Sequence, residues 1–161
     1  MDDVVSFLKD WFIRFLQNRD LVRKNIVSID SKEGFGFKVN YKDKAVNFLI
    51  VPILESNNLE KIDNDKNFGL VALNNAKNLK FAYTNWKKFA GMRFLSLYFI
   101  NPFSDIDKAW ILCPKVHDKI CDKGSLEIGL KAMAEMVEYI SYEKIEERLK
   151  LERQAAGLQN R

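Results

Sequence analysis

The fold is decided above all by the stretch from Phe94 to Cys121, FLSLYFINPFSDIDKAWILCPKVHDKIC. An apolar, aromatic-rich run ends at Asn101-Pro102, a short acidic turn follows, and a second apolar run carries Trp110. Short apolar runs that are rich in aromatic residues and bounded by turn residues predict strands. We therefore expect two adjacent strands of one sheet, joined by a polar turn.

That turn is expected to bring polar side chains to one end of the sheet, which is where α/β proteins usually bind ligands. An Asp-x-Asp pair can hold a hard cation, and a nearby Lys or His can transfer protons. The alternative is an ordinary tight turn, in which Asp is common. No cysteine or second histidine stands at ligand spacing from the lone histidine, so we expect no metal and no cofactor. The residues of this possible polar site are Asp105, Asp107, Lys108 and His117.

Hydrophobic periodicity predicts the elements on either side of this stretch. Apolar residues at helical spacing predict helices over 3–18, 74–89 and 125–140. Alternating or continuous apolar runs predict strands over 26–29, 34–41, 46–54 and 68–73. Within 34–41, the alternation predicts that Phe35, Phe37 and Tyr41 share one sheet face.

Read in order, these elements predict a single α/β domain over residues 1–154. Its core has the order α-β-β-β-α-β, with about five strands flanked by helices. A long C-terminal helix completes the domain, and residues 155–161 are expected to form a frayed tail.

Size and composition narrow the class of protein. A chain of 161 residues fits one domain with a sizeable core. The longest apolar runs, such as 48–54, are too short for a membrane span of about 20 residues. The acidic start, Asp2-Asp3, does not resemble a secretory signal. Cys113 and Cys121 match no metal or redox spacing, so free thiols are expected. We expect a cytoplasmic protein without a membrane partner.

The distribution of charge points to a class of partner. The net charge is +4, but residues 67–104 contain no Asp or Glu and five basic residues, so the rest of the chain sums to −1. A local positive field of this kind attracts the DNA or RNA backbone. Flanking aromatic residues, Phe81 and Tyr83, could stack on bases. The alternative is a solvated helix surface that keeps the protein soluble. The candidate nucleic-acid-binding residues are Lys77, Lys80, Lys87, Lys88 and Arg93.

The segment Lys32–Val39, KEGFGFKV, is similar to the K-G-F-G-F signature of RNA-recognition motifs and cold-shock domains. The resemblance implies strand aromatics that stack on exposed bases. Glu33 interrupts the Lys-Gly step, and Lys38 stands where those families prefer an aliphatic residue. The alternative is a strand whose aromatic face lies in the core.

The order of elements over residues 3–113 resembles the restriction-endonuclease-like fold of PD-(D/E)XK nucleases. That family carries a metal-binding Asp and an acid-x-Lys pair on neighbouring strands. Here the corresponding strands offer only Asn47, and Asp63-x-Asp65-Lys66 lies in the preceding loop. The resemblance therefore implies a degenerate motif, and the catalytic residues stay unknown. Segment 101–117 also resembles uncharacterised archaeal proteins, which implies no function.

Three functions stay open. The first is non-catalytic nucleic-acid binding on a nuclease-like fold. The second is a protein–protein interaction module, or a homo-oligomer, that uses the densely charged segment 143–153, where only Ile145 and Leu149 form an apolar seam. A plain solvated helix end is the alternative for that segment. The third is a metal-dependent nuclease with displaced ligands, although enzymatic activity is the weaker expectation.

Overall fold

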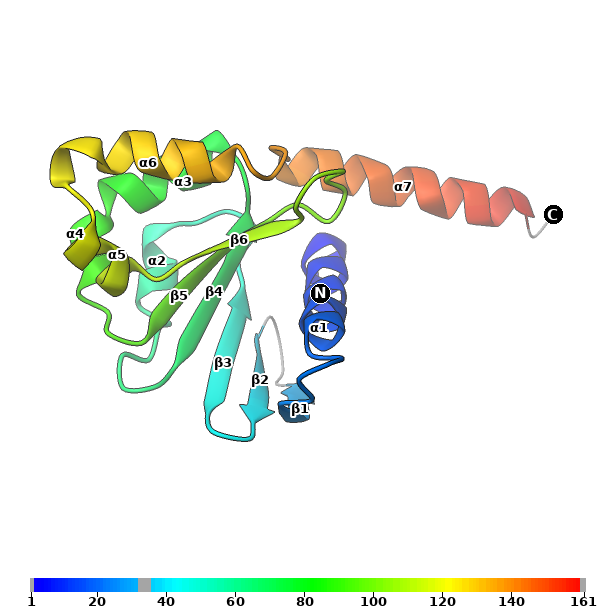
Figure 1. Ribbon diagram of the computed structural model, residues 1–161. Helices are drawn as coiled ribbons and strands as arrows, with labels where there is room; N and C mark the ends of the chain where they lie inside the picture. The colour runs from blue at the N-terminus through cyan, green and yellow to red at the C-terminus, as the bar shows by residue number, and fades with distance from the viewer. Residues whose placement is uncertain (1, 32–35, 160–161) are drawn as a thin grey trace.

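Six strands form one mixed sheet in the order in which they occur in the chain, β1-β2-β3-β4-β5-β6 (Figure 1). The computed structural model describes residues 2–31 and 36–159. The first three strands form an antiparallel meander, β3, β4 and β5 run parallel, and β6 returns antiparallel to β5. The bounds are β1 Ile26–Ser31, β2 Gly36–Tyr41, β3 Ala45–Ile50, β4 Phe68–Leu73, β5 Leu95–Ile100 and β6 Ala109–Leu112.

Helices cover both faces of this sheet, so the α/β fold class is confirmed, with slightly more strands than the five expected (Figure 1). One face packs against α1 and the start of α7, and the other against α3, α4 and α6. The helical bounds are α1 Asp3–Arg19, α2 Ser56–Leu59, α3 Ala76–Thr84, α4 Trp86–Ala90, α5 Pro114–Ile120, α6 Leu126–Ala134 and α7 Tyr142–Gln159, with a 3₁₀ turn at Lys123–Ser125.

The face beneath α1 is an aromatic cluster centred on Phe12. Its ring centroid lies 6.1 Å from that of Phe37 and 5.3 Å from that of Phe48. Phe37 is buried and Tyr41 is half-buried on this same face, which agrees with the alternation of β2. Phe35 lies outside the described residues. Because Phe37 packs in the core, its ring is not free to stack on RNA bases.

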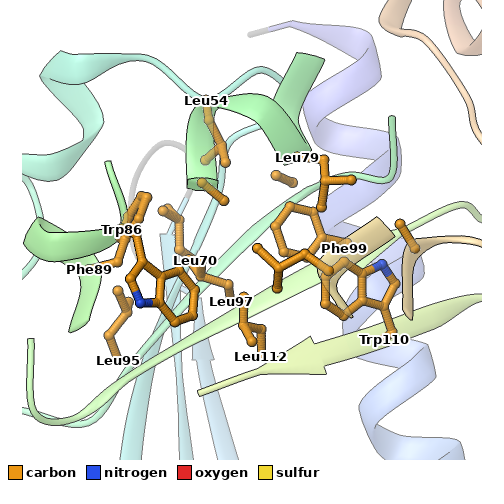
Figure 2. Packing of buried hydrophobic residues seen from close by; sticks show 14 of the residues in the cluster. Leu54, Leu70, Leu79, Trp86, Phe89, Leu95, Leu97, Phe99, Trp110 and Leu112 are labelled. Atoms are coloured by element: carbon orange, nitrogen blue, oxygen red, sulfur yellow. The ribbon is translucent and has the colours of Figure 1, made fainter. Parts of the chain in front are cut away.

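The opposite face packs the helices onto the three parallel strands and β6 (Figure 2). Trp86 and Phe89 of α4 are buried here, and the rings of Phe99 and Trp110 stack with centroids 4.5 Å apart. The spacing of Leu79, Ala82, Trp86 and Phe89 predicts this buried stripe, and all four are buried.

The helices differ from the predicted pattern in three places. The helix expected over 74–89 is interrupted at Asn85, whose side-chain Nδ2 donates to the Phe81 carbonyl 3.0 Å away. The helix expected over 125–140 ends at Ala134, and a non-helical segment follows. A helix, α5, forms where a turn is expected, because Pro114 suits the first turn of a helix.

The long C-terminal helix α7 leaves the body of the protein after its first turns (Figure 1). Ile145 of α7 is fully buried in the cluster that contains α1, and Leu149 packs against that cluster, so the predicted apolar seam lies within the domain. Two polar contacts join α7 to the start of α1: Tyr142 Oη donates to Asp2 at 2.6 Å, and Arg153 pairs with Asp3 at 2.7 Å. This guanidinium lowers the pKa of Asp3, and the hydrogen bond to Asp2 raises the pKa of Tyr142 to about 12. The helix continues to Gln159, through most of the segment expected to fray.

Across residues 2–31 and 36–159, no helix combines the length and the apolar character that crossing a bilayer requires.

Candidate nucleic-acid interface

The carboxyl ends of β4 and β5 are covered by the protein's own chain. Asn74, which is fully buried after β4, donates from Nδ2 to the carbonyls of Ala134 and Val137 at 2.9 and 2.8 Å. Its Oδ1 accepts a hydrogen bond from the Trp110 indole at 2.8 Å. Asn101, after β5, donates to the Glu138 carbonyl at 3.0 Å. These bonds hold the α6–α7 connection over the strand ends where α/β proteins usually bind ligands.

The possible polar site is not assembled as one constellation. Asp105, Asp107 and Lys108 are exposed in the β5–β6 turn, and the Lys108 ammonium donates to the turn carbonyls of Pro102 and Ser104. His117 lies on α5, which begins after the other end of β6. Its ring meets Trp86 edge-on, with centroids 5.7 Å apart. The structure therefore groups the turn residues and separates His117 from them.

The lysines of the acid-free segment are exposed, as expected. Lys77 and Lys80 stand on α3, and Lys87 and Lys88 stand on α4, on the sides opposite the buried stripe. The break at Asn85 turns α4 relative to a continuous helix. As a result, the four lysines do not form one straight row, and they surround a bend instead.

Two adjoining hollows lie along this bend, and both are bordered by Tyr83. The first, about 760 Å³, lies between α4 and the start of α6 and is lined by Lys87, Lys88 and Lys123. The second, about 430 Å³, lies between α3 and α6 and is lined by Lys80 and Lys131. We call these five lysines the lysine face. Tyr83 is 41% exposed and shared by both hollows, so its ring lies in the middle of the lysine face.

The acidic groups in the two hollows already have partners. Asp118 accepts a hydrogen bond from the Trp86 indole at 2.9 Å. Glu127 pairs with Lys131 at 3.3 Å, one turn away on α6. Exposed pairs of this kind contribute little to stability and exchange easily with other anions. The lysine face therefore keeps a positive balance at the surface.

Arg93 does not belong to the lysine face. Its guanidinium stacks over the ring of Phe94, 5.2 Å from the centroid, just before β5 begins. Phe94 borders hollows at the amino ends of the parallel strands, not those beside α3 and α4. Of the five basic residues predicted from the sequence, Lys80, Lys87 and Lys88 belong to the lysine face. Lys77 is exposed on α3 but lines neither hollow, and Arg93 lies in a different region.

Sequence reasoning missed three residues that the fold adds to this surface. Lys123, Lys131 and Tyr139 line the same hollows but come from a segment that begins 33 residues beyond Ala90, the last residue of α4 (123 − 90). Tyr139 is 49% exposed and lines the hollow between α3 and α6. Helical spacing within α6 puts Lys131 on its outer side, but only the packing of α6 against α3 brings Lys131 beside Lys80.

Asn47 and the loop residues Asp63, Asp65 and Lys66 line two hollows at one end of the sheet. Asn47 of β3 and Lys66 line both of these hollows, one of them together with Asp65 and the other together with Asp63. Asp63 accepts the Asp65 backbone N–H at 3.0 Å and lies 3.8 Å from the Lys66 ammonium. In the described ranges, no three His, Cys, Asp or Glu side chains gather into a group that could hold a metal ion.

Comparison with known proteins adds no family to this picture. No family model, no curated protein and no solved structure gives a significant match to the chain.

Proposed function

We propose that the protein binds nucleic acid through the lysine face, without cleaving it. The lysines would contact the phosphate backbone, and Tyr83 would stack on a base. This mode of binding tolerates any sequence, because every base has a π-face and every nucleotide has a phosphate. The order of the helices and strands is the only observation that supports a nuclease-like fold as part of this proposal.

One observation carries the proposal: a half-exposed aromatic ring at the junction of two hollows, surrounded by lysines from three segments of the chain. A surface that serves only solubility needs scattered charges, and it gains nothing from an aromatic ring left open among them. Proteins that bind single strands without sequence preference combine a positive groove with stacking platforms.

The absence of cleavage follows from the carboxylates. The two acids within the hollows are occupied by Trp86 and Lys131. Metal-assisted hydrolysis needs acidic ligands that hold the ion beside the phosphate. We therefore expect single- and double-stranded DNA and RNA to stay intact after incubation with the protein and Mg²⁺ or Mn²⁺. Robust cleavage, lost in Asp107→Ala, would contradict this part of the proposal.

The test is a titration of the protein with labelled DNA and RNA, single-stranded and duplex, at several salt concentrations. Release of about three to five counterions gives a log–log salt slope of roughly −2 to −5. In the variant Lys80→Glu/Lys87→Glu, we expect the slope to flatten and the affinity at low salt to fall at least about tenfold. Both positions are exposed, so the fold should tolerate the change.

The matched control is a double reversal on α7, Lys144→Glu/Lys150→Glu. Both lysines are exposed and form pairs at 3.3 Å with Glu147 and Glu146 on the same helix. Arg148 is not suitable for this purpose, because its guanidinium stacks 4.5 Å from the centroid of Phe103. If both double variants bind as the wild type does, or the wild type binds no nucleic acid at low salt, the proposal fails.

A protein partner, or a second copy of the chain, along α7 is the second candidate. Beyond the Arg153–Asp3 pair, residues 154–157 are exposed, and Leu151 before them is 60% exposed. A helix that projects beyond its domain can give a partner an apolar position to bury. If the protein self-associates through it, Leu151→Asp should lower the mass measured by light scattering, and an unchanged monomer mass for both proteins would argue against a homo-oligomer.

A further inference from the structure

Another cavity, which we call the amino-end cavity, lies at the end of the sheet opposite the covered carboxyl ends. It occupies about 340 Å³ at the amino ends of β3, β4 and β5, beneath the last turn of α1. Its floor is apolar and is formed by Leu16, Val46 and Phe48. This volume is within the range of small-molecule sites, and such sites commonly combine an apolar floor with a few polar groups.

Two tyrosine side chains take part in the lining of this cavity. Tyr41 and Tyr98 both line it, and within the described ranges neither hydroxyl has a hydrogen-bond partner. Burial, and after it the neighbouring Tyr41, raises the pKa of Tyr98 to about 12. Burial also raises the pKa of Tyr41. Both groups are therefore protonated at neutral pH, and each can donate an O–H to a ligand.

Three cationic side chains also line the cavity. Arg19, Arg23 and Lys44 all line it, and Arg23 and Lys44 form no ion pair with any residue in the described part of the chain. Of the two acids that line it, Asp20 already accepts hydrogen bonds from the backbone N–H groups of residues 25 and 26, at 2.9 and 2.8 Å. Asp43 is the other and is exposed in the β2–β3 turn.

The hydrogen-bond donors and acceptors of the cavity indicate which class of ligand it can bind. The cavity offers two hydroxyls, the Arg23 guanidinium and the Lys44 ammonium, beside Arg19, whose guanidinium lies 5.2 Å from the centroid of the Phe15 ring. This is more donor capacity than one carboxylate can use. A phosphate monoester has three terminal oxygens and a charge close to −2, so it matches this excess. The apolar floor beside Phe48 suits a flat ring attached to that phosphate.

We propose that this cavity binds a small aromatic phosphate of about the size of a nucleoside monophosphate. The phosphate lies between Arg23, Lys44 and the two phenols, and the ring covers the floor formed by Val46 and Phe48. This site is separate from the lysine face and does not depend on nucleic-acid binding.

The test is calorimetric titration of the full-length protein with adenosine 5′-monophosphate and with phenyl phosphate. Adenosine and inorganic phosphate serve as probes that lack one half of the ligand. We expect both aromatic phosphates to bind with a Kd below about 1 mM and each half-ligand to bind at least about tenfold more weakly. Absence of binding by both aromatic phosphates at millimolar concentration would overturn the proposal.

Variants of the lining residues test whether the ligand binds in this cavity. Arg23→Ala/Lys44→Ala should weaken binding at least about tenfold, because charge-assisted hydrogen bonds to the phosphate are lost. The matched control, Arg14→Ala/Lys42→Ala, changes one exposed cation on α1, the helix that precedes Arg23, and one in the same β2–β3 turn as Lys44, and neither lines the cavity. Tyr98→Phe removes one hydroxyl and keeps the ring, so it should weaken binding about fivefold or more.

Two outcomes would place the phosphate elsewhere. If Lys80→Glu/Lys87→Glu abolishes binding of adenosine monophosphate, the ligand binds the lysine face, and the cavity proposal is wrong. Equal losses in Arg23→Ala/Lys44→Ala and its control would show a general effect of charge, which also overturns it. Neither outcome bears on whether the lysine face binds nucleic acid, because that is measured with oligonucleotides.

Discussion

The lysine face and the amino-end cavity are both cationic and both contain tyrosine, yet they suit different ligands. In the lysine face, Tyr83 is 41% exposed and stands between two open hollows. In the cavity, Tyr98 lies against the core beneath α1, and its ring contacts Phe12 at a centroid distance of 5.2 Å. An open ring among lysines can stack on a base of a passing strand. A phenol at the wall of a cavity can form a hydrogen bond only with a ligand that enters the cavity. The exposure of the aromatic group therefore distinguishes the two regions better than their charge does.

The asparagines at the covered carboxyl end of the sheet line neither the amino-end cavity nor the two hollows of the lysine face. Asn74→Ala tests this separation, because it removes the donors of two buried carbonyls and the acceptor of the Trp110 indole. We expect the free energy of unfolding, measured with urea, to fall by about 3 to 5 kcal/mol. At temperatures where the variant stays folded, both ligands should bind as to the wild type.

Asn75→Ala is the natural control for that substitution. Asn75 is partly exposed; it caps α3 by accepting the Asn78 backbone N–H at 2.9 Å, and its Nδ2 donates to the Ile140 carbonyl at 3.0 Å. Its loss should cost about 1 to 2 kcal/mol, less than the loss of the fully buried Asn74. If the two alanine variants are equally stable, the asparagine network does not close the end of the sheet as we describe.

The floor of the cavity can be disturbed without touching the lysine face. A Cβ at Gly69 would lie 2.4 Å from a ring carbon of Phe48, so Gly69→Ala must displace that ring from its place over β4. We expect a loss of about 2 to 3 kcal/mol in stability and weaker binding of adenosine monophosphate. Nucleic-acid affinity should be unchanged when measured on the folded variant. A loss of oligonucleotide binding equal to the loss of nucleotide binding would mean that the two regions are one site.

Tyr83 separates stacking from charge in the lysine face. Tyr83→Ala removes a stacking platform, which is expected to cost about 2 kcal/mol for a single strand and little for a duplex. Tyr83→Phe keeps the ring and should bind single strands as the wild type does. Fluorescence anisotropy with matched single-stranded and duplex oligonucleotides measures both. Equal losses for the two kinds of ligand would show that Tyr83 does not stack on bases.

The smallest effect concerns alkaline stability. The pKa of Tyr98 is raised to about 12 from the ordinary value near 10, so its protonated form is favoured in the folded state. The stability linked to this proton is complete below pH 10 and is lost as the pH rises toward 12. We expect the wild type to lose about 1 kcal/mol more than Tyr98→Phe across that interval in urea unfolding. Parallel pH profiles would show that Tyr98 is not shielded at the cavity wall.

Local patterns predict much of the fold and part of the lysine face. Period-two and helical spacings follow from backbone geometry alone, so they place the strands and the buried stripe with Trp86 and Phe89. Contacts between residues that are far apart in the chain cannot be predicted from these local patterns. Asn74 binds carbonyls 60 and 63 residues away, and Lys131 reaches the hollow of α3 only through packing. The bend at Asn85 and the helix after Pro114 depend on single side chains that a periodic pattern does not register.

A competition experiment measures whether the lysine face and the amino-end cavity bind their two kinds of ligand independently. A labelled single-stranded oligonucleotide is titrated with the protein by anisotropy, with and without adenosine monophosphate at a concentration that saturates the protein in calorimetry. We predict the same binding curve in both cases, because the lysine face and the amino-end cavity do not overlap. Displacement of the oligonucleotide at the nucleotide concentration that fills the cavity would contradict the account, as would failure of either ligand to bind.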